Sequence, residues 1–185
     1  MRTFQDMSAG QYVILCARTL IALVLLIAGI LKLGKPNEFV EAVRNYELLP
    51  KSIAAFAGRL LPVIELLAGI GLLSGILVLW SALTAVGLFV LFGLAVAINL
   101  LRGRRDISCG CFGRRQDERL SWGLVARNAL LAGLAAAILP TANEGQQLAF
   151  LDMVIILLVA GAAFASWWLW GMILKMWPLP EDERF

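Results

Sequence analysis

Between residues 53 and 101 the chain carries only two charged side chains, Arg59 and Glu65. A helix rises about 1.5 Å per residue, so this run is too long for one crossing of a hydrocarbon core roughly 30 Å thick. Within lipid it has to be helical, because every backbone N–H and C=O must be satisfied inside the segment. The run therefore predicts two membrane-spanning helices, at 53–74 and 77–101, joined by a tight hairpin.

Three further apolar runs predict spans at 12–33, 120–139 and 148–175. The composition agrees, since 61% of the residues are hydrophobic and 16% are charged. A soluble domain usually has roughly 45–50% apolar and about 25% charged residues. We expect an all-α fold, a polytopic transmembrane helical bundle of about five spans with a four-helix core, in a single membrane domain over residues 1–185. Its first partner is the lipid bilayer.

The polar segment between the first two spans, residues 34–52, contains apolar side chains at helical spacing, Phe39, Val43 and Tyr46. This spacing predicts a short amphipathic helix at the membrane surface.

Small residues at intervals of four predict close helix packing. Gly71 and Gly75 form one such pair, and Ala129, Gly133 and Ala137 form a longer stripe. We expect both sets to pack inside the bundle.

The positive charges are divided unequally between the two sides that five spans would create. One side has Arg2 and Arg18. The other side has the following: Lys32, Lys35, Arg44, Lys51, Arg102, Arg104, Arg105, Arg114, Arg115, Arg119, Lys175 and Arg184. The positive-inside rule then places the N-terminus outside and the arginine-rich loop in the cytoplasm. No nucleic-acid partner is expected, because the basic loop lacks interleaved aromatic residues.

Thiols are the main candidates for chemistry, since the chain has no histidine. Cys109 and Cys111 are separated by one glycine in the arginine-rich loop. Gly110 allows the tight ring that a disulfide between them requires, and a strained ring is easier to reduce. The surrounding arginines favour the reactive thiolate. This pattern indicates a redox-active pair.

Other interpretations of these cysteines remain open. Two thiolates suit Cu(I) or zinc, although nothing nearby completes a four-ligand zinc site, and the pair could also have no chemical role. Cys16, in the first span, is a candidate third thiol, but a lone cysteine in an apolar helix is usually a small hydrophobic residue.

Polar side chains at membrane depth are costly and normally pair with one another or line a functional cavity. Glu65 in the second span and Arg127 in the fourth are candidates for an ion pair, with Arg59 as the rival partner of Glu65. Asn128 follows Arg127, and Asn99 ends the third span. The pair could be structural, or it could act in binding or proton transfer.

Several stretches resemble the MauE/DoxX family of redox-associated bacterial membrane proteins, and the MauE branch most closely. They are residues 28–33, 45–50, 61–66, 99–104, 109–113 and 127–128. The Cys-Gly-Cys-Phe-Gly core at 109–113 is the most specific of them.

The resemblance implies a helical bundle in the inner membrane of a bacterium that supports maturation of a secreted redox enzyme, which in the MauE branch is methylamine dehydrogenase. It also implies a thioredoxin-like partner, with quinone as a candidate electron acceptor. Cys109 and Cys111 would then be the exchanging dithiol, and Glu65, Arg127 and Asn128 would be polar residues of the bundle core.

A secreted client conflicts with a cysteine pair in the cytoplasm. The bundle could be inverted, a span could be miscounted, or the pair could pass electrons across the membrane toward Cys16. The leading hypothesis is a membrane thiol–disulfide redox protein. A non-catalytic assembly factor and a metal-handling protein are the alternatives.

Overall fold

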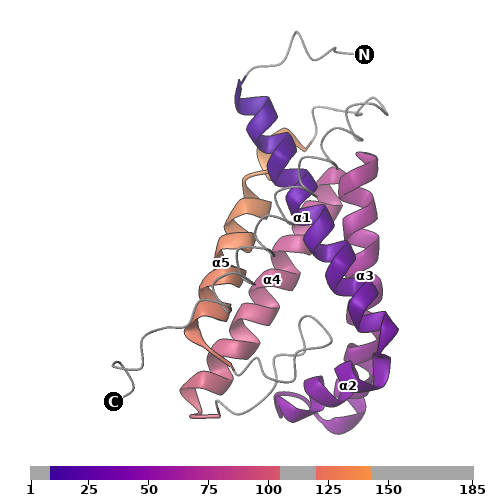
Figure 1. Cartoon of the computed structure of the whole chain (residues 1–185), viewed down its shortest axis with the longest axis vertical. Coiled ribbons are helices and arrows are strands. Elements are labelled where there is room, and N and C mark those ends of the chain that lie inside the picture. The colour runs from indigo at the N-terminus through magenta and orange to yellow at the C-terminus, as the bar shows by residue number, and fades with distance from the viewer. Residues whose placement is uncertain (1–8, 105–119, 143–185) are drawn as a thin grey trace, which may run out of the picture. The chain divides into compact units, whose positions relative to one another are not determined.

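The computed structural model describes residues 9–104 and 120–142, and every element in these ranges is helical (Figure 1). The elements are α1 (Ala9–Gly34), α2 (Pro36–Asn45), α3 (Lys51–Ser74), α4 (Val78–Leu101), α5 (Trp122–Ala136) and a short 3-10 helix, η2 (Leu139–Thr141). All of them belong to one compact unit, Met1–Leu148, and Ala149–Phe185 forms a second unit. The predicted all-α class is confirmed.

Four of the described helices are long and apolar enough to cross a membrane: Gly10–Gly34, Lys51–Ser74, Val78–Leu101 and Trp122–Thr141. They match the first four predicted spans to within a few residues. The four helices fit a multi-pass membrane protein. The predicted fifth span, 148–175, lies outside the described residues, so it and the single domain over 1–185 stay predictions.

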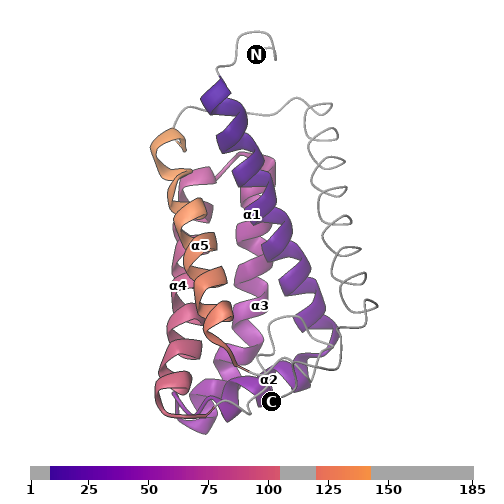
Figure 2. The same cartoon turned by 60° about the vertical axis from the view of Figure 1, so that its left-hand side comes forward.

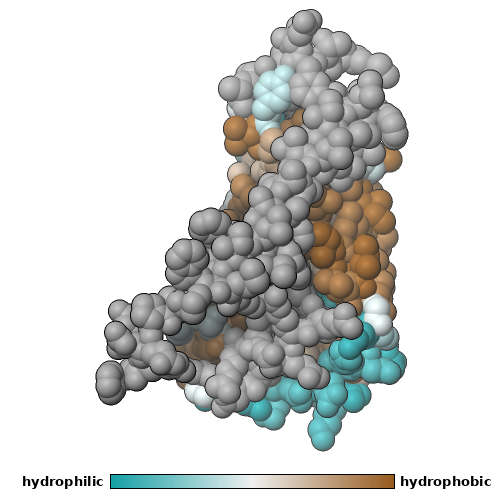
Figure 3. All heavy atoms as spheres, in the orientation of Figure 1, coloured by the Kyte–Doolittle hydropathy of each residue, from teal (hydrophilic) through white to brown (hydrophobic). Residues whose placement is uncertain are grey.

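Large apolar side chains point away from the bundle along these helices. Val13, Phe56 and Leu67 are 68%, 67% and 64% exposed, respectively. In water such a surface would be costly, but in a bilayer it faces hydrocarbon. Hydrophilic side chains gather instead at the end of the bundle where α2 lies (Figure 3).

The long helices pack as two close pairs, α1 with α3 and α4 with α5, which further contacts join into one bundle (Figures 1 and 2). Buried apolar side chains from all four helices form the centre, among them Ile21, Leu72, Leu88 and Ala135. The four long helices alternate in chain direction (Figure 1), and α3 and α4 are joined by a tight turn at residues 75–77.

Close packing depends partly on glycines. A Cβ at Gly29 would lie 2.8 Å from Leu66 Cγ, and one at Gly69 would lie 2.8 Å from Leu26 Cγ. These two positions bring α1 and α3 together from both sides. Gly58 does the same for α2, since its Cβ would lie 2.9 Å from Val40 Cα.

The predicted small-residue pairs have mixed outcomes. Gly71 packs closely against Ser81 of α4, as expected for a packing position. Gly75 instead ends α3 in the left-handed conformation, at φ 74°, which glycine adopts without steric cost.

The prediction for α5 is wrong within the described part of the chain. Ala129, Gly133 and Ala137 are all exposed there. The buried side of α5 is formed by Leu124, Asn128, Ala132 and Ala135. A helix that is apolar around most of its circumference gives little indication of which side faces its neighbours, so small residues alone misassigned the face.

The amphipathic segment predicted between the first two spans is α2, which lies across one end of the bundle (Figures 1 and 2). The helix begins with Pro36, whose fixed φ suits the first helical turn. Phe39, Val40 and Ala42 are buried. This arrangement closes the end of the bundle and forms one wall of the site described next.

Candidate functional site

A buried ion pair joins α1 to α3. Lys32 Nζ donates a hydrogen bond to Glu65 Oε1, and each side chain is only 2% exposed. Burying two charges costs several kcal/mol per ion unless the pair and its hydrogen bonds compensate, as a rough general figure. Such a pair at membrane depth is therefore a candidate functional feature.

The glycines of α1 and α3 explain why the pair can form. Gly29 lies one turn before Lys32, and Gly69 lies one turn after Glu65. Both glycines sit where a side chain would collide with the facing helix. The short distance between the two helices lets the Lys32 and Glu65 side chains contact each other directly in the interface.

Two aromatic rings flank the lysine ammonium. Lys32 Nζ lies 4.8 Å from the centroid of the Phe39 ring and 4.4 Å from that of Phe92. Both distances are within the range of cation–π attraction. Phe39 belongs to α2 and Phe92 to α4. Lys32 of α1 therefore contacts α2 and α4 as well as Glu65 of α3.

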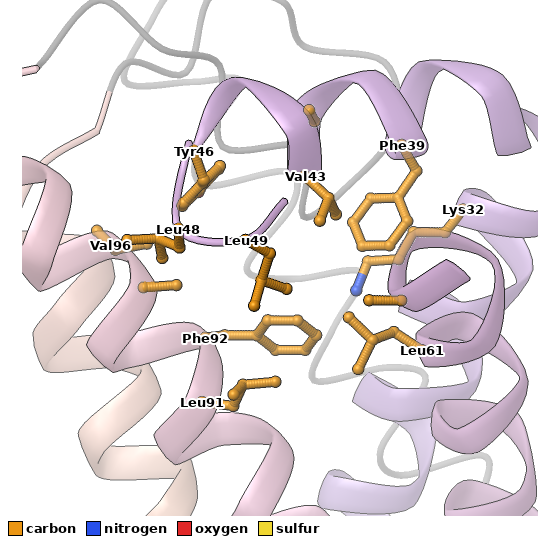
Figure 4. Close-up of a pocket in the computed structure, with 13 residues that line it drawn as sticks. Lys32, Phe39, Val43, Tyr46, Leu48, Leu49, Leu61, Leu91, Phe92 and Val96 are labelled. Atoms are coloured by element: carbon orange, nitrogen blue, oxygen red, sulfur yellow. The ribbon is translucent and has the colours of Figure 1, made fainter. Parts of the chain in front are cut away.

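Lys32 also lines an apolar cavity of about 230 Å³ at the α2 end of the bundle (Figure 4). The walls come from α2, the connection to α3, and the facing sides of α3 and α4. The lining residues are Lys32, Phe39, Ala42, Val43, Tyr46, Leu48, Leu49, Ala57, Leu61, Leu91, Phe92, Ala95 and Val96. Lysine is the only charged residue among them, and its ammonium points between the two rings (Figure 4).

The predicted partner of Glu65 is wrong. The carboxylate pairs with Lys32 and not with Arg127 or Arg59. Arg59 is exposed on α3. Arg127 is half-buried on α5, while Glu65 faces α1.

Sequence reasoning missed Lys32 because it lies near the end of its span and was counted as a topology signal. The signal that could have identified Lys32 is its spacing from the buried residues of the same helix. Ile21, Leu25, Ala28 and Lys32 follow one another at intervals of three or four residues, and all are buried. Lys32 therefore continues the core-facing stripe of α1.

The two predicted amides are buried but bond within their own helices. Asn128 Nδ2 donates to the Leu124 carbonyl at 2.8 Å, and Asn99 Nδ2 donates to the Ala95 carbonyl at 3.0 Å. Asn128 lies where α5 approaches Gly93 of α4. Neither amide lines the cavity.

Cys109 and Cys111 lie outside the described residues. Arg104 and Leu120 border the segment that contains the two cysteines, residues 105–119. Both bordering residues are described, and both lie at the α2 end of the bundle. Arg104 pairs with Glu47 at 2.8 Å, in the connection between α2 and α3. Leu120 is buried in an apolar cluster with Tyr46, Val96, Leu100 and Leu124.

Glu47, the partner of Arg104, has a strained backbone conformation. Glu47 has a φ of 48°, a conformation uncommon for residues other than glycine. Its carboxylate accepts from Arg104, and its carbonyl accepts from Arg102 at 3.5 Å. The beginning of the cysteine-containing segment is thus tied to the connection that lines the cavity.

Cys16 lies in the second turn of α1, at the opposite end of the bundle from α2. Its thiol is free and exposed. In residues 9–104 and 120–142, no group of three or more histidine, cysteine or acidic side chains could hold a metal ion.

The family model of the methylamine utilisation protein MauE matches residues 10–141, which include all the described helices and the cavity. The chain belongs to the MauE family. The matched residues of this chain include Lys32 and Glu65 as well as Cys109 and Cys111.

Curated relatives agree. The chain is 43% identical to the methylamine utilization protein MauE of Paracoccus versutus over 131 residues, covering 69% of this chain and 70% of that one. It is 39% identical to that of Paracoccus denitrificans over 133 residues, or 72% of each chain. For Methylorubrum extorquens the identity is 44% over 128 residues, or 68% and 69% of the two chains. No solved structure matches this MauE-family chain.

Proposed function

We propose that this MauE-family chain is a membrane thiol–disulfide redox protein that supports maturation of a secreted enzyme of methylamine utilisation. Cys109 and Cys111 cycle between dithiol and disulfide. A thiolate of a reduced thioredoxin-like partner attacks the Cys109–Cys111 disulfide, whose S–S bond breaks as a mixed disulfide forms. The second thiol of the partner then resolves the mixed disulfide, which leaves the partner oxidised and the pair as a dithiol.

The observation that carries this proposal is the position of the two ends of the cysteine segment. Arg104 is paired with Glu47, and Leu120 is packed with Tyr46. Arg104 and Leu120, the described residues that flank 105–119, therefore both contact the connection between α2 and α3. Tyr46 and Val96 belong both to that cavity and to the cluster around Leu120. These flanking contacts support the proposal that a redox pair in this segment acts at the end of the bundle that contains the cavity.

The direction we propose is oxidation of client thiols. Formation of each disulfide releases two electrons and two protons, so the pair needs an acceptor that a membrane protein can reach. A quinone dissolved in the bilayer is the acceptor we propose. Cys16 is not assigned a role, because its exposed thiol lies at the other end of the bundle.

The test uses the full chain in lipid nanodiscs, with a reduced thioredoxin-like protein as partner. Wild type and Cys16→Ser, the matched control, should exchange disulfides with it. Cys109→Ser/Cys111→Ser should not. When the partner is supplied instead as its disulfide, the remaining thiolate of one of the single serine variants should attack it and accumulate a mixed disulfide detectable by mass spectrometry. Unaltered exchange by the double variant would overturn the assignment.

Two other outcomes would support the alternative functions. A double serine variant that still binds its partner and still supports enzyme maturation in cells would favour an assembly factor. Stoichiometric Cu(I) or zinc in the purified wild type, lost from the double variant, would favour metal handling.

A further inference from the structure

We propose that the cavity beside Lys32 binds the ring of a membrane quinone, and that the Lys32 ammonium donates a hydrogen bond to one carbonyl oxygen of that ring. The inference rests on the proposed function, because oxidation of Cys109 and Cys111 requires an electron acceptor. It goes further by assigning the acceptor to particular residues of the described structure.

The volume of the cavity suits a single substituted ring. Cavities of roughly 150 Å³ lined by apolar side chains accept benzene. A cavity of about 230 Å³ therefore has room for a six-membered ring with small substituents. The phenyl rings of Phe39 and Phe92 line it and offer flat apolar surfaces.

The charge of the site favours a neutral ligand. Lys32 is the only charged lining residue, and Glu65 already compensates its charge from behind. An anionic ligand would have to compete with a carboxylate that is 2% exposed and in direct contact with the ammonium. A neutral ring with a carbonyl acceptor does not displace Glu65.

Lys32 has N–H donors that Glu65 does not use. An ammonium group carries three N–H donors and accepts no hydrogen bond. Glu65 Oε1 takes one of them, and the rings at 4.4 and 4.8 Å attract the charge without accepting a strong hydrogen bond. A carbonyl oxygen entering the cavity would meet a positive group that also stabilises the negative charge developing there on reduction.

The redox step balances without another reactant. Two thiols of Cys109 and Cys111 lose two electrons and two protons as an S–S bond forms between them. The quinone takes up two electrons and two protons and becomes a quinol. Leu120, which follows the cysteine segment in the chain, packs in a cluster with Tyr46 and Val96, and these two residues also line the cavity.

The experiment measures binding separately from thiol exchange. The full chain is placed in phosphatidylcholine nanodiscs, and uptake of decylubiquinone is measured against empty nanodiscs and against decane. Wild type should bind one decylubiquinone for each chain. Cys109→Ser/Cys111→Ser should bind equally well, although it exchanges no disulfides.

Two independent variants should weaken binding at least tenfold. Lys32→Met/Glu65→Met replaces the ion pair with apolar side chains, and Ala95→Phe fills the cavity but keeps Lys32. Ala126→Phe, at an exposed position of α5, is the matched control and should bind like wild type. Circular dichroism checks that each variant is helical, and if one fails to fold the other decides.

Equal uptake by wild type, Ala95→Phe and the folded double variant would overturn the inference. Equal uptake of decane and decylubiquinone would also overturn it, because the cavity would then be a site for hydrocarbon chains. Thiol exchange by Cys109→Ser/Cys111→Ser would instead contradict the proposed function and leave the binding result to be judged alone.

Discussion

The two helix pairs of the bundle handle buried polar groups in opposite ways. Between α1 and α3 the charges of Lys32 and Glu65 reach across the interface to each other. Between α4 and α5 the amides of Asn99 and Asn128 bond back to carbonyls of their own helices, one turn earlier. The first arrangement makes each helix depend on the other, and the second does not.

This difference indicates which of the two helix pairs contributes to the candidate binding site. An amide whose N–H donates to its own helix makes no hydrogen bond across the interface, and Asn99 Oδ1 has no hydrogen-bond partner among the described residues. An ion pair across an interface keeps a charged donor at the cavity wall and holds the two helices in one register. Lys32 lines the cavity, while neither asparagine does.

Breaking the ion pair should give the largest effect. Lys32→Met leaves the Glu65 carboxylate buried without its partner, which typically costs about 3–5 kcal/mol of stability. The measurement is the loss of helical circular dichroism on titration of the detergent-solubilised chain with sodium dodecyl sulfate.

The double variant tests whether the cost is the uncompensated charge. Lys32→Met/Glu65→Met should recover to within about 1 kcal/mol of wild type, because apolar replacement of a buried pair is often neutral. If Lys32→Met alone were as stable as wild type, the pair would not hold α1 to α3.

A smaller loss is expected from adding one methyl group to the α1–α3 interface. In Gly29→Ala the new Cβ would lie 2.8 Å from Leu66 Cγ and 3.0 Å from the Pro62 carbonyl oxygen. Overpacking of this kind costs about 1–3 kcal/mol. The same unfolding titration measures it.

Gly133→Ala is the matched control on α5. Nothing lies within 4 Å of its added Cβ, so stability should be unchanged or slightly higher. Equal losses in the two variants would mean that helix propensity, and not the close approach of α1 to α3, explains the effect.

The amides of the α4–α5 pair should matter less. Asn128→Ala removes the 2.8 Å hydrogen bond to Leu124. Side-chain hydrogen bonds in membrane proteins contribute about 0.6 kcal/mol on average. A loss of about 3 kcal/mol or more in the same titration would contradict a locally satisfied amide and point to a partner on another helix.

The smallest effect is expected at the edge of the α2 end. Arg104 and Glu47 are 33% and 68% exposed, and solvent-exposed ion pairs contribute between about 0 and 1 kcal/mol. Arg104→Ala should therefore change stability by less than about 1 kcal/mol, and added salt should reduce the difference further. A larger loss that is insensitive to salt would show that Arg104 is essential for the fold.

The lengths and order of the helices could be predicted because a bilayer imposes them. An apolar run such as 53–101 has few alternatives to a helical hairpin, and the described bounds of α3 and α4 differ from the predicted spans by at most two residues. The face that each helix buries was harder to predict. In apolar helices such as α5 the hydrophobic pattern is similar all round, so it did not exclude the exposed stripe of small residues.

The candidate site was predictable only in part. Glu65 stood out because a carboxylate within a span needs a partner. Its partner depends on how α1 packs on α3, a contact between residues 33 positions apart. The cavity could not be foreseen, since it needs α2, the α2–α3 connection and α4 together. Phe39, Val43 and Tyr46, predicted as one face of the surface helix, all line it.

The most direct test of the central claim is the redox state of Cys109 and Cys111 in native membranes. Thiols are labelled with a maleimide before and after reduction and quantified by mass spectrometry, with Cys16 as the internal reference. The account predicts that Cys16 labels without reduction, while Cys109 and Cys111 label fully only after it. It also predicts that they become reduced when quinone is depleted. Full labelling of both cysteines without reduction, unchanged by quinone, would contradict a redox-active pair.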